Sequence, residues 1–128
     1  DAEKIEAAVT PHTKAILAVH LYGQACDMTK IMDIAQKYHL KVVEDCAQSH
    51  GNHWQGKTVG TFGHVGCFSF YPTKGCGAFG DAGCIVTDDA ALAGKFRVFA
   101  IMAVKKNTIM RLWDATAGWM NCRQVFCA

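Results

Sequence analysis

The sequence predicts an α/β fold, because two apolar segments flank a stretch with helical spacing. Residues 15–19 (AILAV) and 41–45 (KVVED) have the length and composition of buried strands. Between them, Asp27 is a good N-cap for a helix. The apolar residues of this helix recur at helical spacing: Met28, Ile31, Met32, Ala35 and Tyr38. Since short connections join the three elements, we expect a βαβ unit with parallel strands.

Other elements are expected on both sides of this unit. Gly, Thr and His residues indicate a loop or short hairpin, alternating aromatic residues indicate a strand, and Pro72 should stop that strand. The expected elements are a helix at 1–9, a loop or hairpin at 51–66, strands at 67–71 and 84–87, and a helix from Asp88 or Asp89 to about residue 99. The last part, 101–128, has no clear start or stop signals.

The composition is that of a globular protein. Of the 128 residues, 51% are hydrophobic and 19% are charged, and the net charge is +2. Such a small charge does not indicate nucleic acid or membrane as a partner, and the longest apolar run (96–104) is too short for a membrane span and contains Arg97. Without a recognisable signal peptide, we expect a cytoplasmic protein. The chain opens at Asp1 inside a predicted helix, which suggests a fragment or a trimmed product.

The seven cysteines form no CxxC pair, and an odd number cannot all pair internally. We interpret them as small buried apolar residues of a protein in a reducing cytosol. The alternative is a zinc site, for which the spacing of His50 and His53 is the only local support. We therefore expect no metal.

Two glycine patterns resemble phosphate-binding loops. Residues 51–58 match GxxxxGK[ST], but this motif requires a helix to begin at Lys57, and the following TVGTFGH contains poor helix formers. A nucleotide-triphosphatase therefore remains only a secondary alternative. Residues 75–80 match GxGxxG, which also requires a helix directly afterwards, whereas a β-branched strand follows here. We interpret these glycines as residues that let the backbone turn sharply.

Asp45 and Lys74 are the residues with the clearest chemical potential. Asp45 ends a buried parallel strand, where open α/β sheets bind ligands, although such an Asp can also cap a following helix. Lys74 follows a Pro-Thr turn and opens a glycine-rich loop, where it could also be a solvated lysine. Together they match an aldehyde cofactor. The amine would form a Schiff base, and the carboxylate would keep the pyridine nitrogen protonated.

Five motifs follow one another in a fixed order between Thr10 and Arg97, and together they are more specific than either glycine pattern. They are HLYGQ at 20–24 with DM at 27–28, VEDCAQ at 43–48 with HG at 50–51, GTFG at 60–63, CFSFYPTK at 67–74, and GAFGD at 77–81. This series resembles the DegT/DnrJ/EryC1/StrS family of sugar aminotransferases that use pyridoxal 5'-phosphate.

The resemblance implies the fold and the reaction. The fold would be a three-layer α/β/α arrangement, a fragment of the large domain of fold-type I pyridoxal-phosphate transferases. Residues 1–128 would form a single partial domain, with 98–128 divergent. The family transfers an amino group, usually from glutamate, to a keto-sugar carried on a nucleotide diphosphate, in amino-sugar and polysaccharide biosynthesis. Its members are homodimers.

The resemblance also implies a role for each matched position. Lys74 would bind the cofactor covalently and move the proton between the sugar and the cofactor. Asp45 would bind the pyridinium nitrogen, and Gln48 would contact the ring or its phenolic oxygen. Ser69 would bind the phosphate, and Asn121 would reach the phosphate of a neighbouring subunit. Some relatives have histidine in place of the lysine and dehydrate their substrate, so Lys74 favours amination.

The match is incomplete in several respects. The family has Asp where this chain has His64. Family members are also considerably longer, and their additional segments complete the cofactor and substrate sites. We therefore expect this chain alone to bind the cofactor weakly and to have little or no activity. The other alternative is a non-catalytic remnant that serves as a binding or interaction module.

Overall fold

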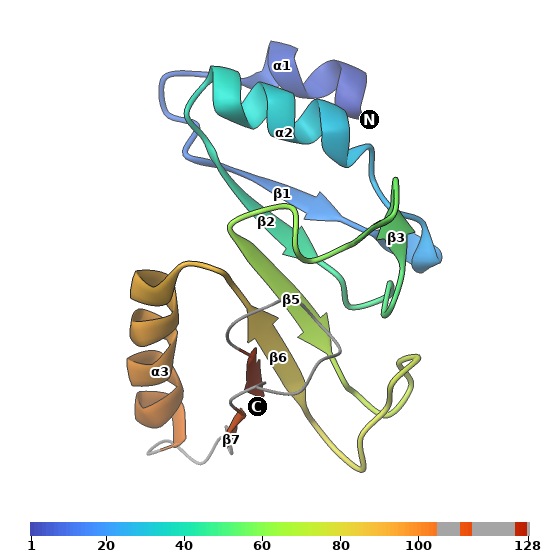
Figure 1. Ribbon diagram of the computed structural model, residues 1–128, viewed down its shortest axis with the longest axis vertical. Helices are drawn as coiled ribbons and strands as arrows, with labels where there is room; N and C mark the ends of the chain where they lie inside the picture. Colours follow the sequence, from blue (N-terminus) through green and yellow to red (C-terminus); the bar gives the residue numbers. More distant parts are fainter. Residues whose placement is uncertain (105–110, 114–124, 128) are drawn as a thin grey trace.

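The computed structural model describes residues 1–104, 111–113 and 125–127. A six-stranded mixed sheet with the order β1-β2-β5-β6-β8-β7 forms its centre (Figure 1). The strands are β1 (Ala15–Val19), β2 (Lys41–Asp45), β5 (Val65–Ser69), β6 (Gly83–Val86), β7 (Arg111–Trp113) and β8 (Val125–Cys127). β1, β2 and β5 are parallel, and the remaining neighbours are antiparallel.

The predicted βαβ unit is confirmed. Helix α2 (Met28–Lys37) connects β1 to β2, and the Oδ1 atom of Asp27 caps it by accepting the N–H of Lys30 at 3.1 Å. The register runs from Ala15 opposite Lys41 to Val19 opposite Asp45. α2 and the two strands share one apolar cluster, which consists of Ile16, Ala18, Met28, Ile31, Ala35, Leu40 and Val42. Burial of this cluster places the carboxyl ends of β1 and β2 side by side.

The two faces of the sheet differ at β1. Ile16 and Ala18 lie in the core, whereas Leu17 and Val19 are 64% and 44% exposed. Because side chains alternate along a strand and paired residues share a face, Val19 lies on the same face as its partner Asp45. The apolar core therefore covers one face of the sheet, and Asp45 belongs to the other.

Several element boundaries differ from the predicted ones. The first helix is interrupted: a 3₁₀ turn, η1 (Ala2–Lys4), precedes α1 (Ile5–Ala8). β5 begins and ends two residues earlier than predicted, and β6 begins one residue earlier. Helix α3 (Ala90–Val104) is capped by Asp89, whose Oδ1 accepts the N–H groups of Ala91 and Leu92, and it extends beyond residue 99.

The segment that matches a P-loop forms a hairpin. β3 (His53–Trp54) pairs with β4 (Lys57–Thr58), and Gln55 and Gly56 have φ values of 47° and 80°. Positive φ at both central residues is the geometry of a tight two-residue hairpin turn. Because Lys57 lies in a strand, no helix N-terminus is present there to bind a phosphate. The structure therefore contradicts the triphosphatase alternative.

The second glycine pattern is also part of a turn. A Cβ atom on Gly77 would lie only 2.4 Å from the carbonyl oxygen of Pro72, so the backbone approaches too closely for any other residue. β6, and not a helix, follows this loop. The interpretation as a turning segment is confirmed. None of the described helices has the length and apolar character that crossing a bilayer requires.

Candidate active site

Asp45 and Ser69 lie on the same face of the sheet, at the carboxyl ends of neighbouring parallel strands. Asp45 pairs with Cys67, and Ser69 follows Cys67 by two residues on β5. The alternation of side chains therefore puts Asp45 and Ser69 on one face. Both residues are partly buried. This edge of the sheet is where α/β proteins bind ligands.

Asp45 does not act as a helix cap. Its Oδ1 accepts the N–H of Ala47 at 2.9 Å, and the residues after it form turns instead of a helix. Its main-chain carbonyl accepts the N–H of His20 at 3.0 Å. These two contacts fix both the backbone and the side chain of Asp45.

Lys74 lies in a loop that follows the carboxyl end of β5 and is held together by main-chain hydrogen bonds. Its N–H donates to the carbonyl of Tyr71 at 2.8 Å, and the N–H of Ala78 donates to the carbonyl of Phe70 at 2.7 Å. Lys74 is partly buried, whereas its immediate neighbours in the loop are exposed. The backbone thus brings Lys74 to the same edge of the sheet as Asp45 and Ser69.

Gln48 is attached to the loop after β1. Its Oε1 accepts the N–H of Tyr22 at 3.0 Å, and Tyr22 adopts a left-handed conformation with φ of 54°. Because this bond occupies the carbonyl end of the side chain, the amide nitrogen remains available as a donor to an anionic oxygen. Asn121, the fifth predicted residue, lies outside the described residues.

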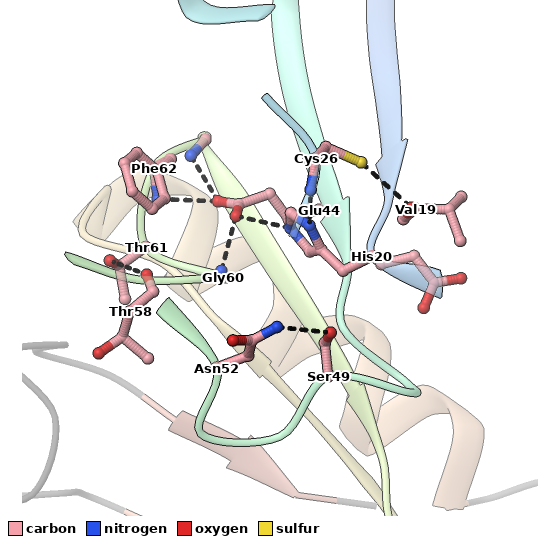
Figure 2. A network of polar contacts seen from close by, with 12 residues as sticks. Val19, His20, Cys26, Glu44, Ser49, Asn52, Thr58, Gly60, Thr61 and Phe62 are labelled. Atoms are coloured by element: carbon pink, nitrogen blue, oxygen red, sulfur yellow. Dashed lines mark hydrogen bonds and ion pairs between the residues drawn. The ribbon is translucent and has the colours of Figure 1, made fainter. Parts of the chain in front are cut away.

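A buried polar cluster around Glu44 was not predicted from the sequence (Figure 2). Glu44 and His20 are fully buried. The Oε1 of Glu44 accepts the N–H groups of Phe62 and Gly63 at 2.8 and 2.6 Å. Its Oε2 accepts the N–H of Gly60 at 2.6 Å and contacts the Nε2 of His20 at 3.1 Å. The carboxylate therefore joins β2 to the 60–63 loop and to the end of β1.

These contacts keep Glu44 ionised and determine the tautomer of His20. Burial alone would raise the pKa of Glu44, but the bonds from His20, Gly63 and Gly60 outweigh it and lower this pKa. The Nδ1 of His20 accepts the N–H of Cys26 at 3.1 Å, so the ring proton belongs on Nε2, which donates to Glu44. Both residues lie within the quoted motifs. Their partners are mainly backbone amides, which a sequence does not reveal.

The same cluster contains a group of potential metal ligands. Ligand atoms of His20, Glu44 and Cys46 lie within 4.8 Å of one another. However, hydrogen bonds engage both ring nitrogens of His20 and both oxygens of Glu44. Burial also raises the pKa of the Cys46 thiol, which disfavours the thiolate that a metal needs. The geometry is that of buried polar side chains whose hydrogen-bonding groups already have partners, and it does not favour a metal site.

The histidine pair considered for zinc is divided between different partners. The Nε2 of His50 contacts the carbonyl oxygen of Ser69 at 2.9 Å, whereas the Nε2 of His53 contacts the hydroxyl of Thr58 at 3.2 Å. The interpretation of the cysteines as buried is confirmed for Cys46 and Cys84 and is wrong for Cys76, which is exposed on the Lys74 loop.

The chain is similar in sequence and in fold to sugar aminotransferases. The profile of the DegT/DnrJ/EryC1/StrS aminotransferase family matches residues 1–124. The chain is 58% identical over 93 residues, which are 73% of this chain, to a UDP-N-acetyl-3-dehydro-alpha-D-glucosamine 3-aminotransferase from Acidithiobacillus ferrooxidans. It therefore belongs to the DegT/DnrJ/EryC1/StrS aminotransferase family.

Solved structures of related proteins confirm the fold class. Streptomyces venezuelae DesV, in complex with a ketimine intermediate, superposes with a TM-score of 0.74 at 38% identity over 98% of this chain. Bacillus subtilis NtdA with bound cofactor PMP superposes with a TM-score of 0.73 at 39% identity over 95% of this chain. The chain is thus an α/β fragment of the fold-type I large domain. It spans 25% of the Acidithiobacillus protein, 32% of the DesV chain and 26% of the NtdA chain.

Proposed function

We propose that this chain carries the lysine-bearing part of a sugar aminotransferase that uses pyridoxal 5'-phosphate. The reaction would transfer an amino group, with glutamate as the donor, to a keto-sugar carried on a nucleotide diphosphate. The observation that carries this proposal is the placement of Asp45, Ser69 and Lys74 at one edge of the sheet. Related enzymes that aminate UDP-linked sugars support the substrate class.

The side chains at this edge match the chemical groups of the cofactor. When bound, pyridoxal phosphate supplies an aldehyde for amine capture and a ring that stabilises negative charge at the neighbouring carbon. Asp45 offers a carboxylate for the ring nitrogen, and Ser69 offers a hydroxyl for the phosphate. Gln48 offers an amide donor for the phenolic oxygen, because Tyr22 occupies its carbonyl.

Lys74 has two tasks in this proposal. Its amine would hold the cofactor by condensing with the aldehyde and releasing water, and as a free amine it would move a proton at the reacting carbon. Both tasks require a neutral amine, whereas an ordinary lysine with a pKa of about 10.4 is almost entirely charged at pH 7.

The rest of the active site belongs to the whole protein. Since the chain spans about a quarter of its relatives, we propose that other segments and a second subunit supply further contacts to the cofactor and the sugar. Asn121 would be such a contact to the phosphate of a neighbouring subunit. We place the enzyme in the cytoplasm as a homodimer.

Chemical trapping tests this proposal even where cofactor binding is weak. The chain is incubated with pyridoxal phosphate, reduced with borohydride, digested and mapped by mass spectrometry. We expect a pyridoxyl label at Lys74, loss of that label in Lys74→Ala, and its retention in the control Lys57→Ala. Labelling spread evenly over surface lysines, or none at all, would favour the non-catalytic binding module.

A further inference from the structure

We infer that Glu44 is a positioning residue for Asp45, and that His20 supports this role by binding both residues. The inference rests on the proposed function, because it assigns Glu44 a task toward the cofactor site. Glu44 precedes Asp45 on β2, so the two carboxylates point to opposite faces of the sheet. Glu44 lies in the buried face, and Asp45 lies on the face proposed to bind the cofactor.

Four hydrogen bonds hold the side chain of Glu44 in one orientation. The N–H groups of Gly60, Phe62 and Gly63 and the ring of His20 converge on the two oxygens of Glu44 (Figure 2). A carboxylate with both oxygens engaged cannot turn about its own bonds. These bonds therefore anchor β2 at residue 44, directly before the Cα atom that carries the Asp45 side chain.

His20 contacts both members of this pair. Its ring contacts Glu44 at 3.1 Å, and its main-chain N–H donates to the carbonyl of Asp45 at 3.0 Å. The other ring nitrogen holds the N–H of Cys26. The end of β1 thus holds Glu44 by a side chain and Asp45 by the backbone.

The 60–63 loop can approach Glu44 because Gly60 and Gly63 have no side chain at the points where the loop passes close to its neighbours. A Cβ atom on Gly63 would lie 2.8 Å from the carbonyl oxygen of Val42, and one on Gly60 would lie 2.6 Å from the ring of Phe68. Gly60 also has a φ of 89°, which favours glycine. The loop is therefore closely packed, so its N–H groups can hold the carboxylate of Glu44 in place.

Two roles of Glu44 give different results when its charge is removed. If Glu44 only held the loop, Glu44→Gln, which keeps one acceptor oxygen and replaces the other with an NH2 donor, would weaken the bonds to the 60–63 loop and leave Asp45 unchanged. If Glu44 positions Asp45, the N–H groups bonded to Asp45 must loosen as well. These are the N–H of Ala47, which binds the Asp45 carboxylate, and the N–H of His20, which binds the Asp45 carbonyl.

Amide hydrogen exchange of the cofactor-free chain, followed by NMR, separates the two roles. In Glu44→Gln we expect exchange at Ala47 and His20 to accelerate at least about tenfold relative to Leu17 in the middle of β1. The milder Glu44→Asp should produce a smaller effect and serves if Glu44→Gln does not fold. The control Ile31→Ala removes core packing under α2, and it should accelerate exchange without favouring Ala47 and His20.

Cofactor titration provides a second readout. Pyridoxal phosphate is titrated until binding to the wild type is saturated, and the same range is used for the variants. Glu44→Gln should raise the dissociation constant at least about tenfold, and Ile31→Ala should not. Unchanged exchange at Ala47 and His20, with faster exchange in the 60–63 loop, would overturn the positioning role. Faster exchange at Ala47 and His20 in a chain that never binds the cofactor would instead contradict the proposed function and leave the structural coupling intact.

Discussion

The carboxylate of Glu44 connects three segments of the chain that are distant in sequence. It binds the 60–63 loop and His20 while remaining inaccessible to solvent. A buried carboxylate in an apolar core is costly unless hydrogen bonds satisfy both oxygens, and here they do. Its contribution should therefore depend strongly on its charge.

The charge of Glu44 should be visible in the pH dependence of stability. Glu44→Gln places amide hydrogens against N–H donors, and we expect it to lower the free energy of unfolding at pH 7 by about 3 kcal/mol. Because the folded state lowers the pKa of Glu44, its stabilisation is present above the unfolded pKa of about 4.3. It is lost as the pH falls through the lower folded value.

Urea unfolding of both proteins between pH 7 and pH 3 measures this effect. The difference between wild type and variant should shrink below about pH 4. Glu6→Gln, which alters an exposed ion pair with Lys37, serves as the control and should leave the midpoint nearly unchanged at pH 7. A difference that stays constant over the whole range would contradict an ionised Glu44.

His64 stands where the resemblance to the family implies an Asp, and its ring makes a hydrogen bond that an Asp side chain could also make. Its Nδ1 accepts the N–H of Val42 at 3.1 Å, as a carboxylate oxygen could. Burial, with a smaller effect of Lys41, lowers the pKa of His64. Protonation of Nδ1 would remove the acceptor.

We therefore expect His64→Asp to change the pH dependence of stability. The contribution of His64 is complete above its unfolded pKa of about 6.5 and is lost as the pH falls through its lower folded pKa. An Asp acceptor should persist to about pH 4. Thermal unfolding between pH 7 and pH 5 should show a smaller loss for His64→Asp than for wild type, and parallel curves would refute this account.

At the scale of elements, residue patterns predicted the ranges of the segments in which burial is regular. They failed where close packing of the backbone sets the range of a strand. β1, α2 and β2 agree with their predicted ranges because apolar spacing and the Asp27 cap define them. β5 was predicted two residues late, because Phe68, Phe70 and Tyr71 are aromatic residues typical of a strand. The strand instead includes Gly66, whose absent Cβ allows the backbone of Gly60 to approach.

That contact between β5 and the 60–63 loop gives a prediction with a matched control. A Cβ atom on Gly66 would lie 2.3 Å from the carbonyl oxygen of Gly60, whereas one on Gly94 in α3 would meet nothing within 4 Å. We expect Gly66→Ala to destabilise the fold by about 3 kcal/mol and Gly94→Ala to stabilise α3 by up to about 1 kcal/mol. Chemical denaturation measures both changes. Tolerance of Gly66→Ala would show that the loop packs elsewhere.

At the scale of the whole molecule, the face of the sheet that carries Asp45 has an apolar border. Leu17 and Val19 are exposed on β1, the edge strand, and Leu21 and Tyr22 continue this surface. Exposed apolar residues that lie together on an edge strand favour association. We therefore expect the isolated chain to self-associate.

Sedimentation velocity over a range of concentrations tests this expectation. Leu17→Lys should shift the distribution toward monomer, because it places a charge in the exposed apolar surface. The control Val98→Lys changes a residue of similar exposure, 57%, on α3, and it should have no effect. Association that is equally sensitive to both variants would exclude the β1 face as the cause.

The candidate site was predictable from the sequence to the extent that motifs determine it. The βαβ pattern predicted that Asp45 lies at the carboxyl end of a parallel strand, whereas Ser69 and Lys74 were singled out by the motifs that resemble the family. The role of Tyr22 in orienting Gln48 and the cluster around Glu44 were not predictable, because main-chain N–H groups supply their contacts. Every residue except proline has such a group, so the sequence does not indicate which of them a side chain binds.

The central claim is that Lys74 and Asp45 serve one bound pyridine ring, and a fixed adduct tests it most directly. Borohydride reduction attaches the pyridoxyl group to Lys74 permanently, so weak binding no longer matters. An ultraviolet pH titration then gives the pKa of the ring nitrogen in wild type and in Asp45→Asn. We predict that this pKa is higher in wild type by about one unit or more, since the Asp45 carboxylate stabilises the protonated ring. Equal values in the two proteins would contradict a shared site.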